Sequence, residues 1–234
     1  FFYFIKMNIN PLIKPASDRS LLIQFGSKIS NRTHQLVSCY TDILLESYGP
    51  YINSISPAYC SILIRLNKNI IIDEMHSKLK SLFKKQIKID SPPPKTLKIP
   101  VCYEKEFSPD MDKVMKYTGY SNDEIIEKHT SGEYLVYFIG FSPGFPYIGG
   151  MDHTLTTPRL TTPRKIVPAG SVAIGGSQTG IYPLQSPGGW NIIGRTYLTL
   201  FQTENINNSL IKIGNKIQFY PITKDEFLLI QNSI

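Results

Sequence analysis

Glycine and proline are concentrated in one segment of the chain. Residues 140–194 hold 11 of the 16 glycines and 7 of the 17 prolines. Short apolar runs lie between and beyond them, such as YLVYFIGF at 134–141, KIVPAGSVAIG at 165–175 and LIKIGNKIQFYPI at 210–222. Many short strands separated by Gly and Pro turns are typical of a β-barrel or sandwich. We therefore expect an all-β domain here, with further strands at GIYPLQS (180–186) and YLTLFQ (197–202).

The first ninety residues follow a different pattern, in which strand and helix signals alternate. CSILIRL at 60–66 alternates apolar and polar residues as a half-buried strand does, and Ser30 or Asn31 is a good helix cap. We expect, in order, strands at 8–14 and 19–25, a helix from Ser30 to Ser47, two strands within 52–66 broken at Ser56-Pro57, and a helix capped by Asp73 that ends near Ile87. This order, β-β-α-β-β-α, predicts a small α+β domain built as a two-layer sandwich.

A proline run marks the boundary between these two parts. The residues SPPPK at 91–95 favour a stiff, extended segment without ladder donors. We expect an α+β domain at 1–90, a linker at 91–96 and the barrel domain at 97–234. The barrel domain begins with a strand at 97–103 and two short helices, the first opened by Ser108-Pro109, the second by a capping box of Ser121 and Glu124. A last helix is expected in TKDEFLLIQ at 223–231.

Charge and composition exclude several classes of protein. The net charge is +7, but residues 1–99 carry 14 basic and 6 acidic side chains, whereas 100–234 carry 11 and 12. Lysines of the segment 78–88 account for much of the excess, and Leu79, Leu82 and Phe83 between them indicate the solvated face of an amphipathic helix rather than a nucleic-acid surface. No apolar run reaches the roughly 18 residues of a membrane span. Three scattered cysteines and four scattered histidines favour a cytoplasmic protein without a metal site.

Several linked motifs in 133–196 resemble one known family. They are GFSPGFPYIGG, two TPR turns, VPAGSV, GGSQTGIYP and SPGGW, in that order. They resemble the family of the 5-oxoprolinase B subunit (PxpB), also called the KipI or allophanate hydrolase subunit 1 family. The resemblance extends from about residue 11 to 222 and is strongest at 133–197. It implies a small α+β domain followed by a cyclophilin-like β-barrel, in agreement with the strand and helix signals.

The resemblance also implies a function within an assembly. It implies a chain that acts with A-type and C-type subunits, as in the bacterial 5-oxoprolinase, to open 5-oxoproline to L-glutamate at the expense of ATP, which is bound by the complex. The alternatives are a KipI-like inhibitor that binds a sensor histidine kinase, or a subunit in allophanate or urea metabolism. Gene context separates them, because neighbouring A-type and C-type subunits favour the enzyme and a neighbouring sensor kinase favours the inhibitor.

Three side chains are candidates for catalysis. Arg159 and Arg164 lie in the two TPR turns, five residues apart, and a guanidinium suits a carboxylate or a phosphate. Each could equally pin a barrel loop. His129 matches a histidine of the family pattern and has the intrinsic pKa of a general acid or base, but it could also stabilise the end of a helix.

A second group of candidates concerns binding. Aromatic side chains on rigid Pro/Gly turns make a good pocket wall, and glycines can present backbone N–H groups to an anion. The alternative is that both serve only to build the barrel. The proposed substrate-binding residues are Phe145, Tyr147, Gln178, Tyr182 and Trp190, and the proposed anion-binding backbone is that of Gly175, Gly176 and Gly180.

Overall fold

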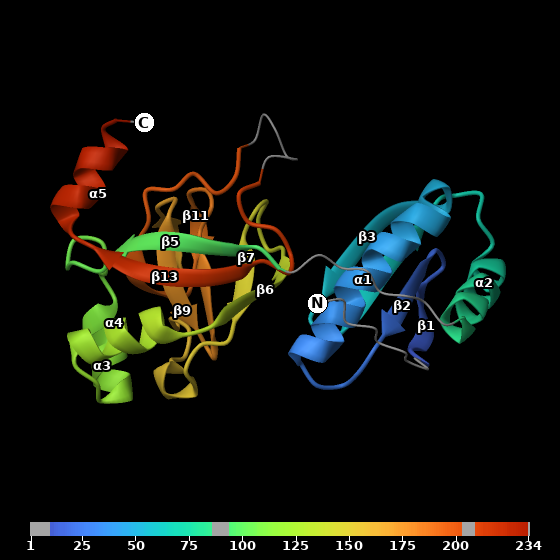
Figure 1. Ribbon diagram of the computed structural model, residues 1–234, viewed down its shortest axis with the longest axis horizontal. Coiled ribbons are helices and arrows are strands. Elements are labelled where there is room, and N and C mark those ends of the chain that lie inside the picture. The colour runs from blue at the N-terminus through green and yellow to red at the C-terminus, as the bar shows by residue number, and fades with distance from the viewer. Residues whose placement is uncertain (1–9, 86–93, 203–208, 234) are drawn as a thin grey trace. The chain divides into compact units, whose positions relative to one another are not determined.

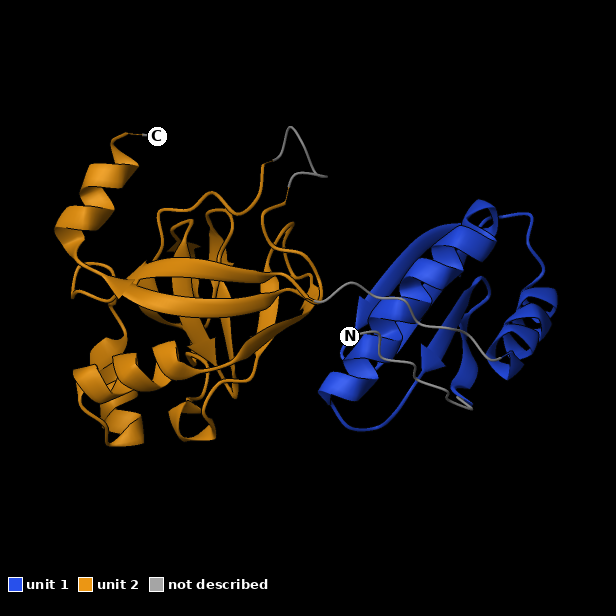
Figure 2. Ribbon diagram, in the orientation of Figure 1, with its two compact units in different colours: residues 1–93 blue, residues 94–234 orange. Residues whose placement is uncertain are grey.

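The structure is a computed structural model that describes residues 10–85, 94–202 and 209–233. The fold divides into two compact units, residues 1–93 and 94–234 (Figure 2). The division falls within the predicted Pro-rich linker at 91–96, of which residues 91–93 lie outside the described residues. Each unit has a hydrophobic core of its own.

The first unit packs two helices on an antiparallel sheet with the strand order β1-β2-β4-β3 (Figure 1). Alternate residues of the central strands β2 and β4 are fully buried, among them Leu21, Ile23 and Ile64, and they share one core with the helices. The predicted order β-β-α-β-β-α is confirmed. The elements are β1 (Leu12–Ser17), β2 (Ser20–Gln24), α1 (Asn31–Tyr48), a 3₁₀ turn (Gly49–Tyr51), β3 (Ile52–Ala58), β4 (Ser61–Leu66) and α2 (Ile72–Lys84).

Two details of this unit differ from the expectation. β3 runs straight through Ser56-Pro57, and the chain turns instead at Tyr59-Cys60. Because β3 is an edge strand, a proline without an N–H is tolerated in it. Asp73 does not cap α2, which begins at Ile72 without a side-chain cap, but lies in its first turn, where a carboxylate suits the helix dipole.

The second unit is a closed barrel with the strand order β10-β7-β6-β13-β5-β12-β9. β13 pairs with β5 in parallel, and the other described barrel pairs are antiparallel. A separate ladder joins β8 to β11. The strands are β5 (Thr96–Cys102), β6 (Tyr134–Ile139), β7 (Pro146–Gly149), β8 (Arg164–Val167), β9 (Ser171–Gly175), β10 (Gln178–Ile181), β11 (Ser186–Gly188), β12 (Asn191–Arg195) and β13 (Lys216–Ile222).

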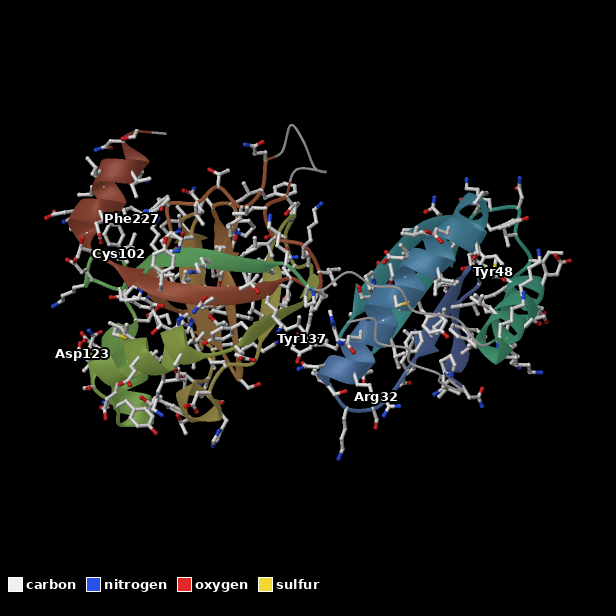
Figure 3. All side chains as sticks on the ribbon, viewed as in Figure 1. Arg32, Tyr48, Cys102, Asp123, Tyr137 and Phe227 are labelled. Carbon is white, nitrogen blue, oxygen red and sulfur yellow. The ribbon has the colours of Figure 1, made fainter. Side chains whose placement is uncertain are left out.

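Helices α3 (Met111–Thr118), α4 (Asn122–Ser131) and α5 (Lys224–Gln231) and a 3₁₀ turn (His153–Leu155) complete this unit. The predicted capping box at the start of α4 is confirmed, and Thr223 and Glu226 form a second one on α5. Figure 3 shows Phe227 of α5 beside Cys102, with which it shares a small apolar cluster. None of the described helices has the length and apolar character needed to cross a membrane.

Three predictions for this unit are wrong. Residues 180–186 are not one strand, because β10 ends at Ile181 and β11 begins at Ser186. Ser108-Pro109 does not open α3, whose N-cap is Asp110; the Ser108 hydroxyl donates instead to the carbonyls of Tyr103 and Glu104. The segment 197–202 contains no strand. Its apolar side chains Leu200 and Phe201 are buried. The apolar pattern here therefore indicates a buried loop and not a paired strand.

Candidate functional site

The barrel wall divides the candidate residues between two cores. One core is the barrel interior, to which β5, β6, β7, β9, β10, β12 and β13 contribute. The other is a smaller cluster of Phe145, Val167, Ala173, Tyr182, Trp190 and Ile192. Along β9, Val172 and Ile174 belong to the interior and Ala173 to the smaller cluster. Since successive side chains of a strand point to opposite faces, the two cores lie on opposite sides of this wall.

His129 belongs to the interior. Its side chain is fully buried, Nδ1 lies 2.7 Å from the Tyr103 hydroxyl, and Nε2 lies 3.0 Å from the hydroxyl of Thr179. The Thr179 hydroxyl donates to the Ala173 carbonyl, so it accepts from Nε2–H, and Tyr103 donates to Nδ1. Burial lowers the pKa of His129 to about 3. The ring is therefore neutral, with both nitrogens hydrogen-bonded.

The guanidinium of Arg164 is held by a buried carboxylate. Its two terminal nitrogens donate to the two oxygens of Asp110 at 2.8 and 2.6 Å. Asp110 is 5% exposed and also accepts the backbone N–H of Ile192 at 2.7 Å. A bidentate pair of this kind is strong and geometrically specific. It ties the start of β8 to the start of α3 and to β12.

Arg159 is placed quite differently from Arg164. Its side chain is exposed, and its guanidinium lies over the Trp190 ring, 5.5 Å from the ring centroid. A guanidinium in this position gains cation–π attraction while its N–H groups stay available. Within residues 10–85, 94–202 and 209–233, no carboxylate lies within ion-pair distance of Arg159.

Trp190 stands in a group of aromatic rings. Phe145 meets Trp190 and Tyr182 edge-on, with centroids 5.5 and 5.1 Å apart, and Tyr147 lies 5.8 Å from Trp190. Such edge-to-face contacts stabilise the cluster beyond the burial of apolar surface. Tyr147 is half-buried, whereas Phe145, Tyr182 and Trp190 are buried. Four of the five proposed substrate-binding residues are thus in one cluster.

Burial raises the pKa of the Tyr182 hydroxyl, although the Trp190 backbone N–H and the charges of Arg159 and Arg164 act in the opposite direction. Both arginines therefore lie within electrostatic reach of this phenol. The fifth candidate, Gln178, is half-buried at the start of β10, opposite Gly175.

The proposed anion-binding glycines have another use in this structure. A Cβ on Gly175 would overlap the Trp190 indole, and one on Gly180 would crowd Phe145 and Trp190. Gly176 has a left-handed backbone (φ +66), and its N–H donates to the Thr157 carbonyl at 2.9 Å, so this N–H is not free for an anion. Gly175 and Gly180 make room for aromatic rings against the strands.

The turn beside the cluster carries backbone strain. Phe141 is the one non-glycine residue in the described chain with a positive φ (70°), and its side chain is 66% exposed. A bulky residue in the left-handed region is uncommon and costs conformational energy. The Phe141 ring meets Phe145 edge-on at 5.6 Å, which extends the aromatic cluster to the surface.

Sequence reasoning missed Asp110, Asn191, Thr179 and Tyr103. Asn191 is fully buried and donates to the carbonyls of Pro158 and Ile174. Asp110 directly follows Ser108-Pro109 and could have been noticed as an N-cap acid, but its partner is 54 residues away. No group of three or more metal-ligating side chains occurs in the part of the chain that the structure describes.

Comparison with known proteins places this chain in a family. The model of the carboxyltransferase domain, subdomain C and D, matches residues 11–211. The chain belongs to this family. Among its relatives is the 5-oxoprolinase B subunit of Bacillus subtilis (strain 168), 33% identical over 233 residues that cover 94% of this chain and 97% of the relative. The 5-oxoprolinase B subunit of Escherichia coli O157:H7 is 46% identical over 130 residues, 56% of this chain and 60% of the relative.

Solved structures of the family agree with the fold. The crystal structure of TTHA0988 is 29% identical, with a TM-score of 0.76 over 87% of this chain and 40% of that one. The conserved uncharacterized protein PH0987 from Pyrococcus horikoshii is 40% identical, with a TM-score of 0.55 over 92% of this chain and all of that one. The predicted α+β domain followed by a β-barrel is confirmed, as is the resemblance to the 5-oxoprolinase B subunit.

Proposed function

We propose that this chain is the B subunit of an ATP-dependent 5-oxoprolinase, which opens 5-oxoproline to L-glutamate together with A-type and C-type subunits. The observation that carries the proposal is the similarity to a curated 5-oxoprolinase B subunit over nearly the whole of both chains. That similarity includes the α+β unit as well as the barrel. The proposal therefore applies to the α+β unit and the barrel together and not to the barrel alone.

The reaction defines what the complex needs. Opening the lactam adds the hydroxyl of water to the carbonyl carbon, breaks the C–N bond and leaves the nitrogen as an amine. Amide resonance makes this carbonyl a poor electrophile, which is why coupling to ATP is needed. The complex must hold the substrate carboxylate, bind ATP and admit the water that attacks the carbonyl carbon. Hydrogen-bond donors held at fixed positions can bind the negative charges of the carboxylate and the phosphate groups.

Within this chain we assign the substrate-facing role to Arg159 and the aromatic cluster beneath it. Arg159 is exposed, without a carboxylate partner among the described residues, and Tyr147 is half-buried beside Trp190. Arg164 and His129 are engaged by Asp110, Tyr103 and Thr179. We therefore propose that Arg164 and His129 support the barrel and that Arg159 contacts substrate.

ATP is proposed to be bound by the complex. The segment GGSQTG at 175–180 has no lysine and therefore no Gly-Lys-Ser/Thr sequence of a Walker A loop. Its Gly176 N–H is already used within the barrel. We propose that the complex acts in the cytoplasm, where ATP is present and the three free thiols stay reduced.

Reconstitution tests this function. The chain is co-expressed with A-type and C-type 5-oxoprolinase subunits, and glutamate release from 5-oxoproline is measured with ATP, without ATP and without this chain. We expect ATP-dependent release that requires this chain. A verified, folded three-subunit complex that releases no glutamate would contradict the proposal.

A further inference from the structure

The two TPR turns use the same residue type in two different ways. Arg164 is neutralised by the buried carboxylate of Asp110. Arg159 has no such partner in residues 10–85, 94–202 and 209–233, and it lies on an aromatic ring instead. A cation held at a defined position without a counter-charge is suited to bind an anion from outside the chain.

The backbone on both sides of Arg159 is fixed by hydrogen bonds to the barrel. Thr157 exchanges two hydrogen bonds with Gly176, at 3.2 and 2.9 Å. The Pro158 carbonyl accepts from Asn191 at 2.8 Å, and the Leu160 N–H donates to the Gly189 carbonyl at 2.7 Å. Four hydrogen bonds therefore surround one exposed side chain. They hold the backbone that carries Arg159 at a defined place on the barrel.

Asn191 holds this loop at a cost in folding stability. Its amide nitrogen makes two hydrogen bonds, to Pro158 and, at 3.3 Å, to Ile174. Its side-chain oxygen is buried and has no hydrogen-bond partner. A buried, unsatisfied acceptor destabilises a fold, whereas an apolar side chain would fill a strand position without this cost. What the amide provides at this position is the hydrogen bond that ties the Arg159 loop to β12.

We propose that Arg159, lying over Trp190 and positioned by Asn191, is the subsite that binds the carboxylate of a small substrate. This proposal rests on the proposed function, in which that substrate is 5-oxoproline. The planar edge of a guanidinium donates two parallel hydrogen bonds to a carboxylate. The carboxylate of 5-oxoproline is unchanged by ring opening, so one subsite can hold substrate and product in register. Asn191 acts through Arg159 and is a positioning residue.

Trp190 provides a direct test, because it is the only tryptophan in the chain. A carboxylate that draws Arg159 toward itself alters the surroundings of the indole and its fluorescence. The full chain is titrated with 5-oxoproline, with L-glutamate and with 2-pyrrolidinone, which has the same lactam ring without the carboxylate. We expect saturable changes with the two carboxylates and a Kd at least about tenfold weaker for 2-pyrrolidinone.

Matched variants show whether the fluorescence change depends on Arg159. Arg159→Gln is expected to weaken carboxylate binding about tenfold or more, and Arg159→Lys by less, because lysine keeps the charge without the planar fork. Lys165→Gln removes an exposed positive charge from the neighbouring strand β8 and is expected to leave the Kd unchanged. Equal affinity for 5-oxoproline and 2-pyrrolidinone, or an Arg159→Gln variant that binds as the unaltered chain does, would overturn the subsite.

Asn191→Ala tests the positioning role against a merely structural one. Its control is Ile193→Val on the same strand, which removes buried volume from the barrel interior and lowers stability. At a temperature where both variants are folded, we expect Asn191→Ala to weaken 5-oxoproline binding several-fold and Ile193→Val to leave it unchanged. Equal Kd values for the two variants would remove Asn191 from the proposal.

The outcomes separate this subsite from the proposed function. An active reconstituted complex whose chain binds 5-oxoproline independently of Arg159 would overturn the subsite and leave the function standing. An inactive complex whose chain still binds carboxylates through Arg159 would overturn the function and support the subsite. If Arg159→Gln weakens only the association with the A-type and C-type subunits, the carboxylate belongs to a partner protein, and the small-molecule subsite is wrong.

Discussion

For single residues, the side of the barrel wall decides what a side chain can do. Thr179 and Gly180 are neighbours on β10, yet Thr179 contacts His129, whereas Gly180 faces Phe145 and Trp190. Two adjacent residues of one strand therefore contact different sites, the buried His129 on one side of the wall and the aromatic cluster beside Arg159 on the other. The sequence motifs contain both residues in one block, and nothing in the block indicates that they face different cores.

The neutral, buried state of His129 makes the stability of the barrel depend on pH. Burial lowers the pKa of His129 from 6.5 to about 3. Between these values the unfolded chain binds a proton that the folded chain does not, so the free energy of unfolding falls as the pH falls. The expected slope is about 1.4 kcal/mol per pH unit from pH 6.5 down to pH 3, with no contribution above 6.5.

Urea unfolding at pH 7, 6 and 5 measures this slope. Replacing the ring by His129→Gln removes the titrating group, and we expect the pH dependence of the variant to be shallower by that amount. Other histidines, including the buried His34, contribute equally to both proteins. Parallel pH profiles of the two proteins would show that His129 is not held neutral in the fold.

The glycines beneath the aromatic rings are expected to be intolerant of a methyl group. Gly175→Ala places a Cβ inside the Trp190 indole, so the ring must move. We expect a loss of about 1–3 kcal/mol of stability, as for other overpacked sites, together with a shift of Trp190 fluorescence.

The neighbouring Gly176→Ala is the control, because no atom lies near its added Cβ and only its positive φ opposes the change. We expect Gly176→Ala to lower stability without moving the Trp190 emission. An unshifted emission maximum in Gly175→Ala would contradict the packing described for this ring.

Among the helices and strands, local signals were predictable and long-range pairs were not. The capping box of Ser121 and Glu124 and the Gly119 C-cap depend on residues within one or two turns, and the structure has both. The pair of Asp110 and Arg164 spans 54 residues. Its formation depends on how α3, β8 and β12 are arranged in space, which no local pattern encodes. For the same reason the sequence groups His129 with Arg159 and Arg164, whereas the structure gives each of the three different surroundings.

The Asp110–Arg164 pair is expected to fix α3 to the barrel. Asp110→Asn keeps the shape of the side chain but removes the charge that Arg164 and the Ile192 N–H use. Hydrogen bonds to a charged group contribute about 1.5–3 kcal/mol each, and Arg164 is partly exposed, so we expect a loss of about 2 kcal/mol.

A double-mutant cycle with Arg164→Gln measures the coupling between the two side chains. We expect a coupling energy of about 1–3 kcal/mol, because the partners are in direct contact. Additive losses in the double variant would show that the pair does not stabilise this part of the fold.

The molecule as a whole consists of two units that each bury a core of their own. Residues 94–234 form the barrel with its interior cluster, and the core of the first unit contains none of its side chains. We therefore expect a fragment of residues 94–234 to fold alone. Its thermal unfolding should be cooperative and its Trp190 emission should equal that of the full chain. A fragment without a cooperative transition would show that the barrel needs the first unit.

The function proposed for this molecule and the subsite proposed within it meet in Arg159, which we expect to hold the substrate carboxylate of a 5-oxoprolinase. Both are tested together by glutamate release from the reconstituted complex over a range of 5-oxoproline concentrations, with the unaltered chain, Arg159→Gln or Lys165→Gln. We predict a KM raised at least about tenfold by Arg159→Gln and unchanged by Lys165→Gln. Identical saturation curves for all three complexes would contradict the assignment of Arg159.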